Sequence, residues 1–333
     1  IKPNIEKFIE QHHVDRELWN KAGDLGLLCM SIPEEYGGGG GTFAHEAVIA
    51  EEQAHALDDG WANQVHSAIV AHYLLEYGTQ EQKERWLPEL ASGKMVAAIA
   101  MTEPDAGSDL QALRTTARRD GDEYVVNGQK TWTTLGQYGD WIFMLVRTDP
   151  KADKPQKGIS FLLIDMSSPG LTVRPIKLID GGKEVNEVFL DDVRVPAENL
   201  IGEDNQGWAC AKFLLAHERT GIAGVARSKR GIEKLKEIAK TEQDGQGSSL
   251  LANPFFRRKV ADLETDLTAL EFTQLIIDGD ADRLKAARRR IELLVLLAHS
   301  CGRSCSLRFL RRLIGASALR PRCGPARSPL GRR

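Results

Sequence analysis

The segment "MVAAIAMTEPDAGSD" (Met95–Asp109) divides the chain into two kinds of sequence. Its first six residues are apolar, as in a buried strand, and the rest form a loop of hydroxyl, carboxylate, proline and small side chains. A simple turn needs one or two special residues, and this loop contains many more. On residue types alone, a capped turn is the simplest explanation for it.

Upstream of this segment, apolar residues recur at helical spacing. In "RELWNKAGDLGLL" (16–28) the residues with this spacing are Leu18, Trp19, Ala22, Leu25 and Leu28. Thr42 is placed to cap the next helix, and Thr79 with Gln82 three residues later fits a capping box. We therefore predict an N-terminal α-helical domain over residues 1–94.

Downstream of the segment, the period changes to that of strands. Asp120–Gly121 and Asn127–Gly128 are both hairpin-turn signals. The runs "DWIFMLVRTD", "GISFLLIDM", "LTVRPIKL" and "NEVFLDDVRVP" are typical of strands bounded by Gly, Pro and Asp. These patterns predict a middle antiparallel β-barrel or β-sandwich domain over residues 95–203.

Helical spacing returns after this β domain. Residues 208–242 are compatible with one long helix, and residues 253–278 with a second helix antiparallel to it. We predict an incomplete C-terminal helical bundle over residues 204–282, and hence an α+β fold class in the order helices, β domain, helices.

The composition is that of a globular protein. The chain has 333 residues, 42% of them hydrophobic, and a formal net charge of −3. We find no apolar run of the ~20 residues that a membrane-spanning helix needs, and no signal peptide. The chain opens on Ile1 rather than Met, which suggests that the true start lies upstream. Its 5 cysteines lack CxxC pairs, so we expect a reducing, cytoplasmic location without disulfides or a metal site.

Residues 283–333 form an atypical basic tail. They contain 14 Lys and Arg against one acid, Glu292, whereas residues 1–282 contain 30 against 46. Such a tail is compatible with a basic arm for nucleic acid or an acidic membrane surface. Its Arg, Leu, Pro, Gly and Cys content is equally typical of a GC-rich gene read out of frame. We favour the second interpretation and expect no nucleic-acid partner.

Two polar strand ends offer the same chemistry. Thr102 and Ser108 can donate hydrogen bonds, and Gly107 lets a ligand approach the backbone closely. In "KTWTTLG" (130–136), Trp132 can stack on a flat ring, with Thr134 on the same side of the strand. Placed side by side, the two segments would form a wall for a planar, hydrogen-bonding cofactor.

A family resemblance favours the cofactor wall over a simple capped turn. The chain resembles the acyl-CoA dehydrogenase flavoproteins in "MTEPDAGSDLQALRTTA", "VNGQKTWTTLGQYGDWIFMLVRTD" and "FLDDVRVPAENLIGEDNQGW", and also in "PEEYGGGG" and "ERTGIAG". The resemblance covers residues 1–278. It implies the α–β–α order, FAD, an acyl-CoA thioester substrate, an electron-transfer flavoprotein as electron acceptor, and a homo-oligomer or a hetero-oligomer of related subunits.

The resemblance also assigns residues to the flavin. The first segment would supply Ile99, Ala100, Met101, Thr102, Gly107 and Ser108, with Ser108 also near the CoA arm. The second would supply Trp132, Thr133 and Thr134. Glu103 is expected to be structural, accepting hydrogen bonds from loop amides.

The catalytic base is harder to place. Most family members carry a glutamate on a late loop before Gly-Thr, and we find no such motif here. A minority place the base on the long helix before an arginine, which corresponds to Glu218 and Arg219. A Glu-Arg pair on a helix is usually a solvated face, but this one follows an apolar run that ends in Ala216. We therefore predict Glu218 as the base and Arg219 as a substrate-positioning residue.

Two other functions remain open. A flavin-dependent monooxygenase on the same fold would need no base for the α proton. An inactive fragment that still binds flavin or acyl-CoA would result if the C-terminal helices are lost.

Overall fold

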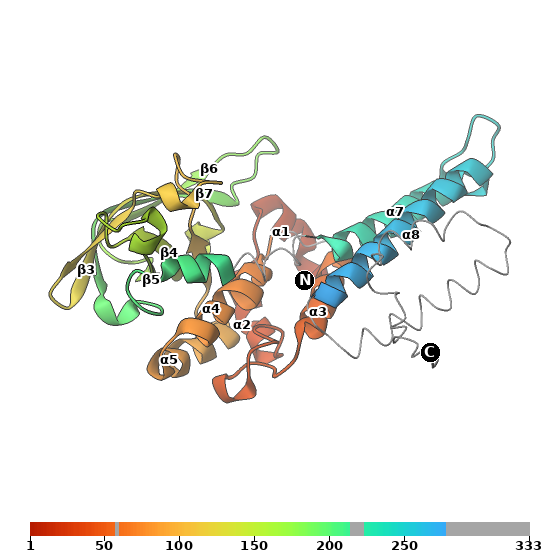
Figure 1. The fold of residues 1–333 in the computed structure, drawn as a ribbon. Helices are drawn as coiled ribbons and strands as arrows, with labels where there is room; N and C mark the ends of the chain where they lie inside the picture. The colour runs from red at the N-terminus through yellow and green to blue at the C-terminus, as the bar shows by residue number, and fades with distance from the viewer. Residues whose placement is uncertain (57–59, 214–222, 278–333) are drawn as a thin grey trace, which may run out of the picture. The chain divides into compact units, whose positions relative to one another are not determined.

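The computed structural model describes residues 1–56, 60–213 and 223–277. Helices precede and follow a β module, which confirms the predicted α+β class and its order (Figure 1). The helices before the module are α1 (Ile5–Gln11), α2 (Arg16–Asp24), α3 (Phe43–His55), a π-helix (Val65–Val70), α4 (Ala71–Tyr77) and α5 (Gln80–Ala91). The strands are β1 (Ala97–Ala100), β2 (Thr116–Asp120), β3 (Glu123–Thr134), β4 (Trp141–Arg147), β5 (Ile159–Asp165), β6 (Leu171–Ile176) and β7 (Val185–Pro196). After it, residues 207–213 are helical, and α7 (Val225–Thr241) and α8 (Pro254–Ile277) follow.

The two predicted caps begin α3 and α5. The Gln82 amide N–H donates to Thr79 Oγ1 at 3.2 Å, and the Thr79 N–H donates to Gln82 Oε1 at 3.0 Å. This reciprocal pair satisfies two of the amides that the first turn of α5 leaves free. At α3, the Thr42 N–H donates to His45 Nδ1 at 3.0 Å. The sequence pattern therefore located both helix starts correctly.

The β module is a seven-stranded sheet in the order β1-β4-β2-β3-β7-β6, with β5 paired to β4. Most neighbours are antiparallel as predicted, but β4 pairs in parallel with β1 and, through one residue pair, with β2. A parallel neighbour requires a long connection. Between β1 and β4 that connection includes the β2–β3 hairpin, so the chain can return in the same direction.

The sheet is covered on both faces in its middle. Phe143 and Leu145 of β4 belong to a core shared with α4 and α5. The alternate residues Ile142, Met144 and Val146 belong to a second core shared with β7. This double burial explains why β4 is a continuous apolar run rather than an alternating one.

One predicted turn is wrong. Asp120–Gly121 does begin a hairpin, with Asp120 opposite Glu123, but Asn127–Gly128 lies inside the continuous strand β3. A Cβ on Gly128 would lie 2.6 Å from Thr115 Cα, so this glycine permits a close approach of two backbones. Tertiary packing, rather than a local turn, requires it.

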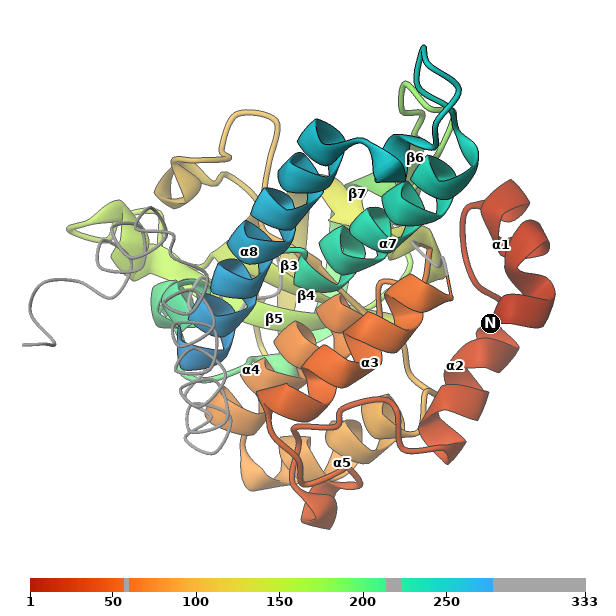
Figure 2. The same cartoon turned by 90° about the vertical axis from the view of Figure 1, so that its right-hand side faces the viewer.

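The predicted long helix over residues 208–242 is also interrupted. Gly224 has a left-handed φ of 62° and stands at the N-terminus of α7. Helical residues 207–213 precede this break. The second predicted helix is confirmed as α8, and α7 and α8 run side by side as an antiparallel hairpin (Figures 1 and 2).

A buried histidine connects the helices to β1. His66, on the π-helix, is 1% exposed and lies edge-on to the Trp19 ring. Its Nε2 hydrogen bonds to the Leu90 carbonyl at 2.9 Å, so Nε2 carries the proton. Its Nδ1 then accepts a hydrogen bond from the Ala97 N–H at 3.3 Å. The neutral ring is thus used on both sides, and it positions the start of the strand that leads to the candidate site.

Candidate functional site

The loop after β1 folds back on itself as a tight hairpin. Glu103 and Ala106 exchange two backbone hydrogen bonds, of 2.9 and 3.1 Å. Gly107 and Ser108 follow this turn and are exposed. The Thr102 side chain lies close by, because a Cβ on Gly107 would be 3.9 Å from its Cγ2. The turn therefore presents a hydroxyl group and accessible backbone at the end of β1.

A buried ion pair holds this loop against β3. Lys130 Nζ lies 2.8 Å from Glu103 Oε1, with the two side chains 0% and 6% exposed, and it also donates to the Met101 carbonyl. Glu103 accepts further hydrogen bonds from the Arg114 and Thr115 amides. Glu103 is therefore structural, as predicted from the sequence.

The electrostatics of the pair favour two charged partners at neutral pH. Burial raises the pKa of Glu103, but the charge of Lys130 and the hydrogen bonds that the carboxylate accepts outweigh this and keep the pKa below its ordinary value. Burial lowers the pKa of Lys130 to about 8, against the opposing effect of Glu103. We did not predict Lys130. The available signal was that a buried structural glutamate needs a cationic partner.

The second segment is joined directly to the first. The Thr131 N–H donates to the Thr102 carbonyl at 2.9 Å. Immediately after it, the β3–β7 register shifts by one residue between Lys130 and Thr133, so that Thr131 and Trp132 form a β-bulge. Trp132 has a φ of 62°, and its side chain is 56% exposed. The bulge turns a large ring outward beside the Thr102 loop, as bulges next to functional sites often do.

The predicted flavin residues differ in what they can offer. Thr102, Met101, Ile99 and Thr134 are half-buried, and Gly107 and Ser108 are exposed. The side chains of Ala100 and Thr133 are each only 1% exposed and face the interior. These last two residues therefore contribute almost no accessible surface to a ligand. The contact of each residue with flavin stays a prediction.

The predicted base and its neighbour, Glu218 and Arg219, lie outside the described residues. The helical residues 207–213 that lead to them are described. Phe213 lies 5.9 Å from the Tyr73 ring and 5.5 Å from the Tyr77 ring, measured between centroids. The start of this helix is thus anchored against α4.

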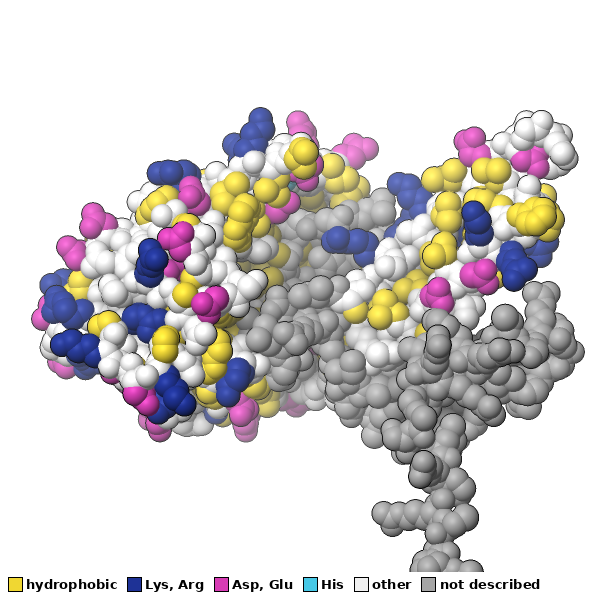
Figure 3. Space-filling view, turned by 45° about the horizontal axis from the view of Figure 1, so that its top comes forward, with side chains coloured by type: hydrophobic (Ala, Val, Ile, Leu, Met, Phe, Trp, Pro, Cys, Tyr) yellow, Lys and Arg dark blue, Asp and Glu magenta, His cyan; other side chains and the backbone are white. Residues whose placement is uncertain are grey.

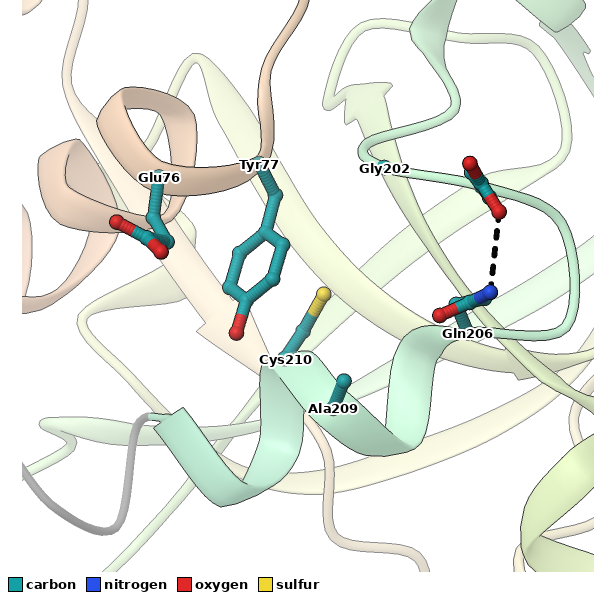
Figure 4. A pocket seen from close by; sticks show the side chains of 7 residues that line it. Glu76, Tyr77, Gly202, Gln206, Ala209 and Cys210 are labelled. Carbon is teal, nitrogen blue, oxygen red and sulfur yellow. Dashed lines mark hydrogen bonds between the residues drawn. The ribbon is translucent and has the colours of Figure 1, made fainter.

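A separate cavity of about 320 Å³ lies near the start of the same helix (Figure 4). Its lining residues are Glu76, Tyr77, Gly202, Glu203, Gln206, Ala209 and Cys210. The Tyr77 ring lies beside Cys210, whose pKa burial raises to about 11, so its thiol remains protonated. No predicted site residue lines this cavity, and we assign it no role.

Within the described residues, no cluster of three or more His, Cys, Asp or Glu side chains could hold a metal ion. Among those same residues, no helix is long and apolar enough to cross a membrane.

Comparison with known proteins identifies the family. Models of the acyl-CoA dehydrogenase N-terminal, middle and C-terminal domains match residues 1–94, 98–193 and 205–301. A solved acyl-CoA dehydrogenase from Geobacillus kaustophilus is 34% identical with a TM-score of 0.77, over 83% of this chain and 74% of that one. The chain belongs to the acyl-CoA dehydrogenase family. The match runs to residue 301, beyond the predicted limit of 278 and into the basic tail.

Two other relatives are informative. The rat mitochondrial long-chain specific acyl-CoA dehydrogenase (Rattus norvegicus) is 41% identical over 231 residues, which are 68% of this chain and 54% of that protein. The ChsE4-ChsE5 complex from Mycobacterium tuberculosis is 34% identical with a TM-score of 0.72, over 79% of this chain and 68% of that one. The chain spans about half the length of the rat protein.

Acyl-CoA dehydrogenases are FAD-dependent, and the residues present fit that cofactor. The exposed Trp132 indole stands on a bulge of β3. The half-buried Thr134 follows two residues later, and the half-buried Thr102 accepts a hydrogen bond from the Thr131 N–H through its carbonyl. A flat ring with hydrogen-bonding edges would cover the indole and reach these hydroxyl groups.

Proposed function

We propose that this chain is an FAD-dependent acyl-CoA dehydrogenase that converts an acyl-CoA thioester into its trans-2-enoyl thioester. The observation that carries the proposal is the direct contact between the two segments that would form the wall for the cofactor. The threonine-glutamate-proline loop and the Trp132 bulge meet through the Thr131–Thr102 hydrogen bond, and the Glu103–Lys130 pair lies beneath them. Family membership supplies the reaction class.

In this proposal the protein provides orientation and a base. When bound, FAD supplies the acceptor for the hydride that leaves the β carbon. Glu218 removes the proton from the α carbon, and Arg219 orients the thioester. The α C–H group is very weakly acidic, so the carboxylate must be placed beside it and shielded from water. The apolar residues before Glu218 support that shielding.

The substrate and partners are also proposals. The rat relative is named for long-chain acyl-CoA, so we propose a long-chain thioester as the first substrate to test. The ChsE4-ChsE5 complex supports assembly with a different subunit. Assembly with a second copy of this chain is the alternative. An electron-transfer flavoprotein is the proposed electron acceptor.

The test is rapid-mixing reduction of bound FAD by saturating palmitoyl-CoA in the absence of oxygen. Glu218→Gln keeps the shape of the side chain but cannot take the proton, so we expect reduction to slow by ~10²–10⁴-fold. Bound FAD and thioester affinity should be retained. Glu237→Gln, at an exposed glutamate of α7, is the matched control and should change nothing.

Three results would contradict the proposal. A parent chain that binds no FAD, or whose FAD is not reduced by any acyl-CoA tried, would favour the inactive fragment. Reduction within a few-fold of the parent rate in Glu218→Gln would move the base elsewhere. Reduced flavin that reacts with oxygen to hydroxylate a substrate would favour the monooxygenase.

A further inference from the structure

The β3–β7 pair contains two bulges, and an asparagine stands opposite each. At one end of the pair, β7 carries the extra residue and Asp192 has a φ of 50°. Asn127 faces that bulge and exchanges two hydrogen bonds of 2.9 Å with Asp192. At the other end, β3 carries the extra residue, Trp132, and Asn186 is paired with Thr133. The first bulge lies away from the candidate site and the second forms part of it.

Asn186 is fully buried, and both of its side-chain N–H groups are used. Its Nδ2 donates to the Thr133 carbonyl at 2.9 Å and to Gln137 Oε1. A main-chain carbonyl can only accept, so the amide nitrogen must face Thr133 and the orientation of the side chain is determined. Gln137 in turn donates from Nε2 to the Lys183 carbonyl at 2.7 Å. One chain of hydrogen bonds thus runs from the bulge to the connection before β7.

This chain of hydrogen bonds encloses a strained segment. Leu135 has a left-handed φ of 47°, which is unfavourable for a branched apolar side chain. Its N–H donates to the Glu184 carbonyl at 2.6 Å. Two left-handed residues, Trp132 and Leu135, therefore lie within four positions, and such a backbone persists only where its surroundings hold it.

We propose that Asn186 is a positioning residue for the cofactor, acting through Thr133 and Gln137 to hold the Trp132 bulge in its outward orientation. This inference rests on the proposed function, in which Trp132 lies against the flavin. Asn186 itself is covered by protein and touches no reacting atom. Its role is to keep an unfavourable backbone in one conformation, so that the indole and Thr134 face the ring together.

The test compares three variants of the full chain. Asn186→Ala removes both donated hydrogen bonds. Gln137→Met keeps the side-chain length at a half-buried position and removes the hydrogen bonds of Gln137 to Asn186 and to the Lys183 carbonyl. Asn127→Ala is the matched control, because it removes the hydrogen bonds of the other bulge in the same strand pair.

The first readout is hydrogen exchange of the flavin-free protein, followed by mass spectrometry. Losing one or two such hydrogen bonds should speed amide exchange over residues 131–139 by about tenfold or more in Asn186→Ala, and less in Gln137→Met. Asn127→Ala should speed exchange only around residues 127 and 192. Equal acceleration over residues 131–139 in all three variants, or none in Asn186→Ala and Gln137→Met, would overturn the proposal.

The second readout is the absorption spectrum and midpoint potential of bound FAD. Both should shift in Asn186→Ala and Gln137→Met and remain at parent values in Asn127→Ala. Faster exchange with an unchanged spectrum and potential would show that Asn186 is merely structural, and would overturn the positioning role. If the parent binds no FAD, the proposed function and this role both fail, while the exchange data still report whether Asn186 holds the bulge.

Discussion

The β module and the α7–α8 hairpin are stabilised in different ways. Strands β4 and β5 are buried on both faces, and the module even encloses a complete ion pair. The hairpin buries few large side chains among the described residues, and many others are exposed (Figure 3). The large apolar side chains exposed on it are Ile238 (47%), Phe255 (80%), Leu263 (49%) and Leu270 (40%). The candidate flavin wall thus stands on the part of the molecule with the more complete interior.

The largest expected contrast concerns two ion pairs of equal length. Glu103–Lys130 in the β module and Glu264–Lys236 across the hairpin are both 2.8 Å, but the second pair is 46% and 37% exposed. Glu103→Ala leaves a buried ammonium group and two loop amides without their partner, so we expect a loss of about 3–5 kcal/mol in the free energy of unfolding. Glu264→Ala should cost about 0–1 kcal/mol.

Urea unfolding of both variants measures this contrast. Adding Lys130→Met to Glu103→Ala should recover part of the loss, because no buried charge then remains. Similar losses in the two single variants would show that the interior of the module is less isolated from solvent than its geometry indicates.

A second contrast concerns two phenylalanines. Phe161 is fully buried, with ring centroids 4.7 Å from Tyr73 and 5.5 Å from Phe143. Phe161→Ala should therefore lower the unfolding free energy by about 3–5 kcal/mol. Phe255 is 80% exposed, and Phe255→Ala should stay within about 0.5 kcal/mol of the parent. Thermal unfolding of both variants, followed with one spectroscopic signal, would check these values. A large loss of stability in Phe255→Ala would show that this face of the hairpin packs against another surface in solution.

The sequence predicted features that depend on local residue patterns. The helix–β–helix order and the capping box at Thr79 follow from spacing and residue type, whereas the structural role of Glu103 came from the family resemblance. The prediction of a turn at Asn127–Gly128 was wrong because this glycine is required by the close approach of Thr115. That approach exists only in the folded sheet. The prediction of one long helix was wrong because a left-handed residue, Gly224, interrupts an otherwise helical pattern.

The candidate site shows the same division. The two segments that form it were visible as motifs, but their junction was not. The bulge at Trp132 depends on how β3 pairs with β7, and the role of Asn186 depends on that register. Neither could be read from a single strand, because each is a property of two strands together.

Because His66 is neutral in the folded chain, the anchoring of the start of β1 depends on pH. Burial lowers the pKa of this imidazole to about 4, from an ordinary 6.5. Below pH 6.5 the unfolded chain takes up a proton that the folded chain refuses, so stability falls as the pH falls from 6.5 toward 4. A difference of this size corresponds to about 3 kcal/mol.

Urea unfolding at pH 7 and pH 4.5 measures this effect. His66→Gln can keep one donor and one acceptor without a titrating group, so its stability should depend less steeply on pH over this interval than that of the parent. An unchanged dependence would assign the acid sensitivity to other groups. If the coupling holds, protonation of one ring nitrogen withdraws the acceptor of the Ala97 amide, and the strand that carries the Thr102 loop loses its first anchor to the helices.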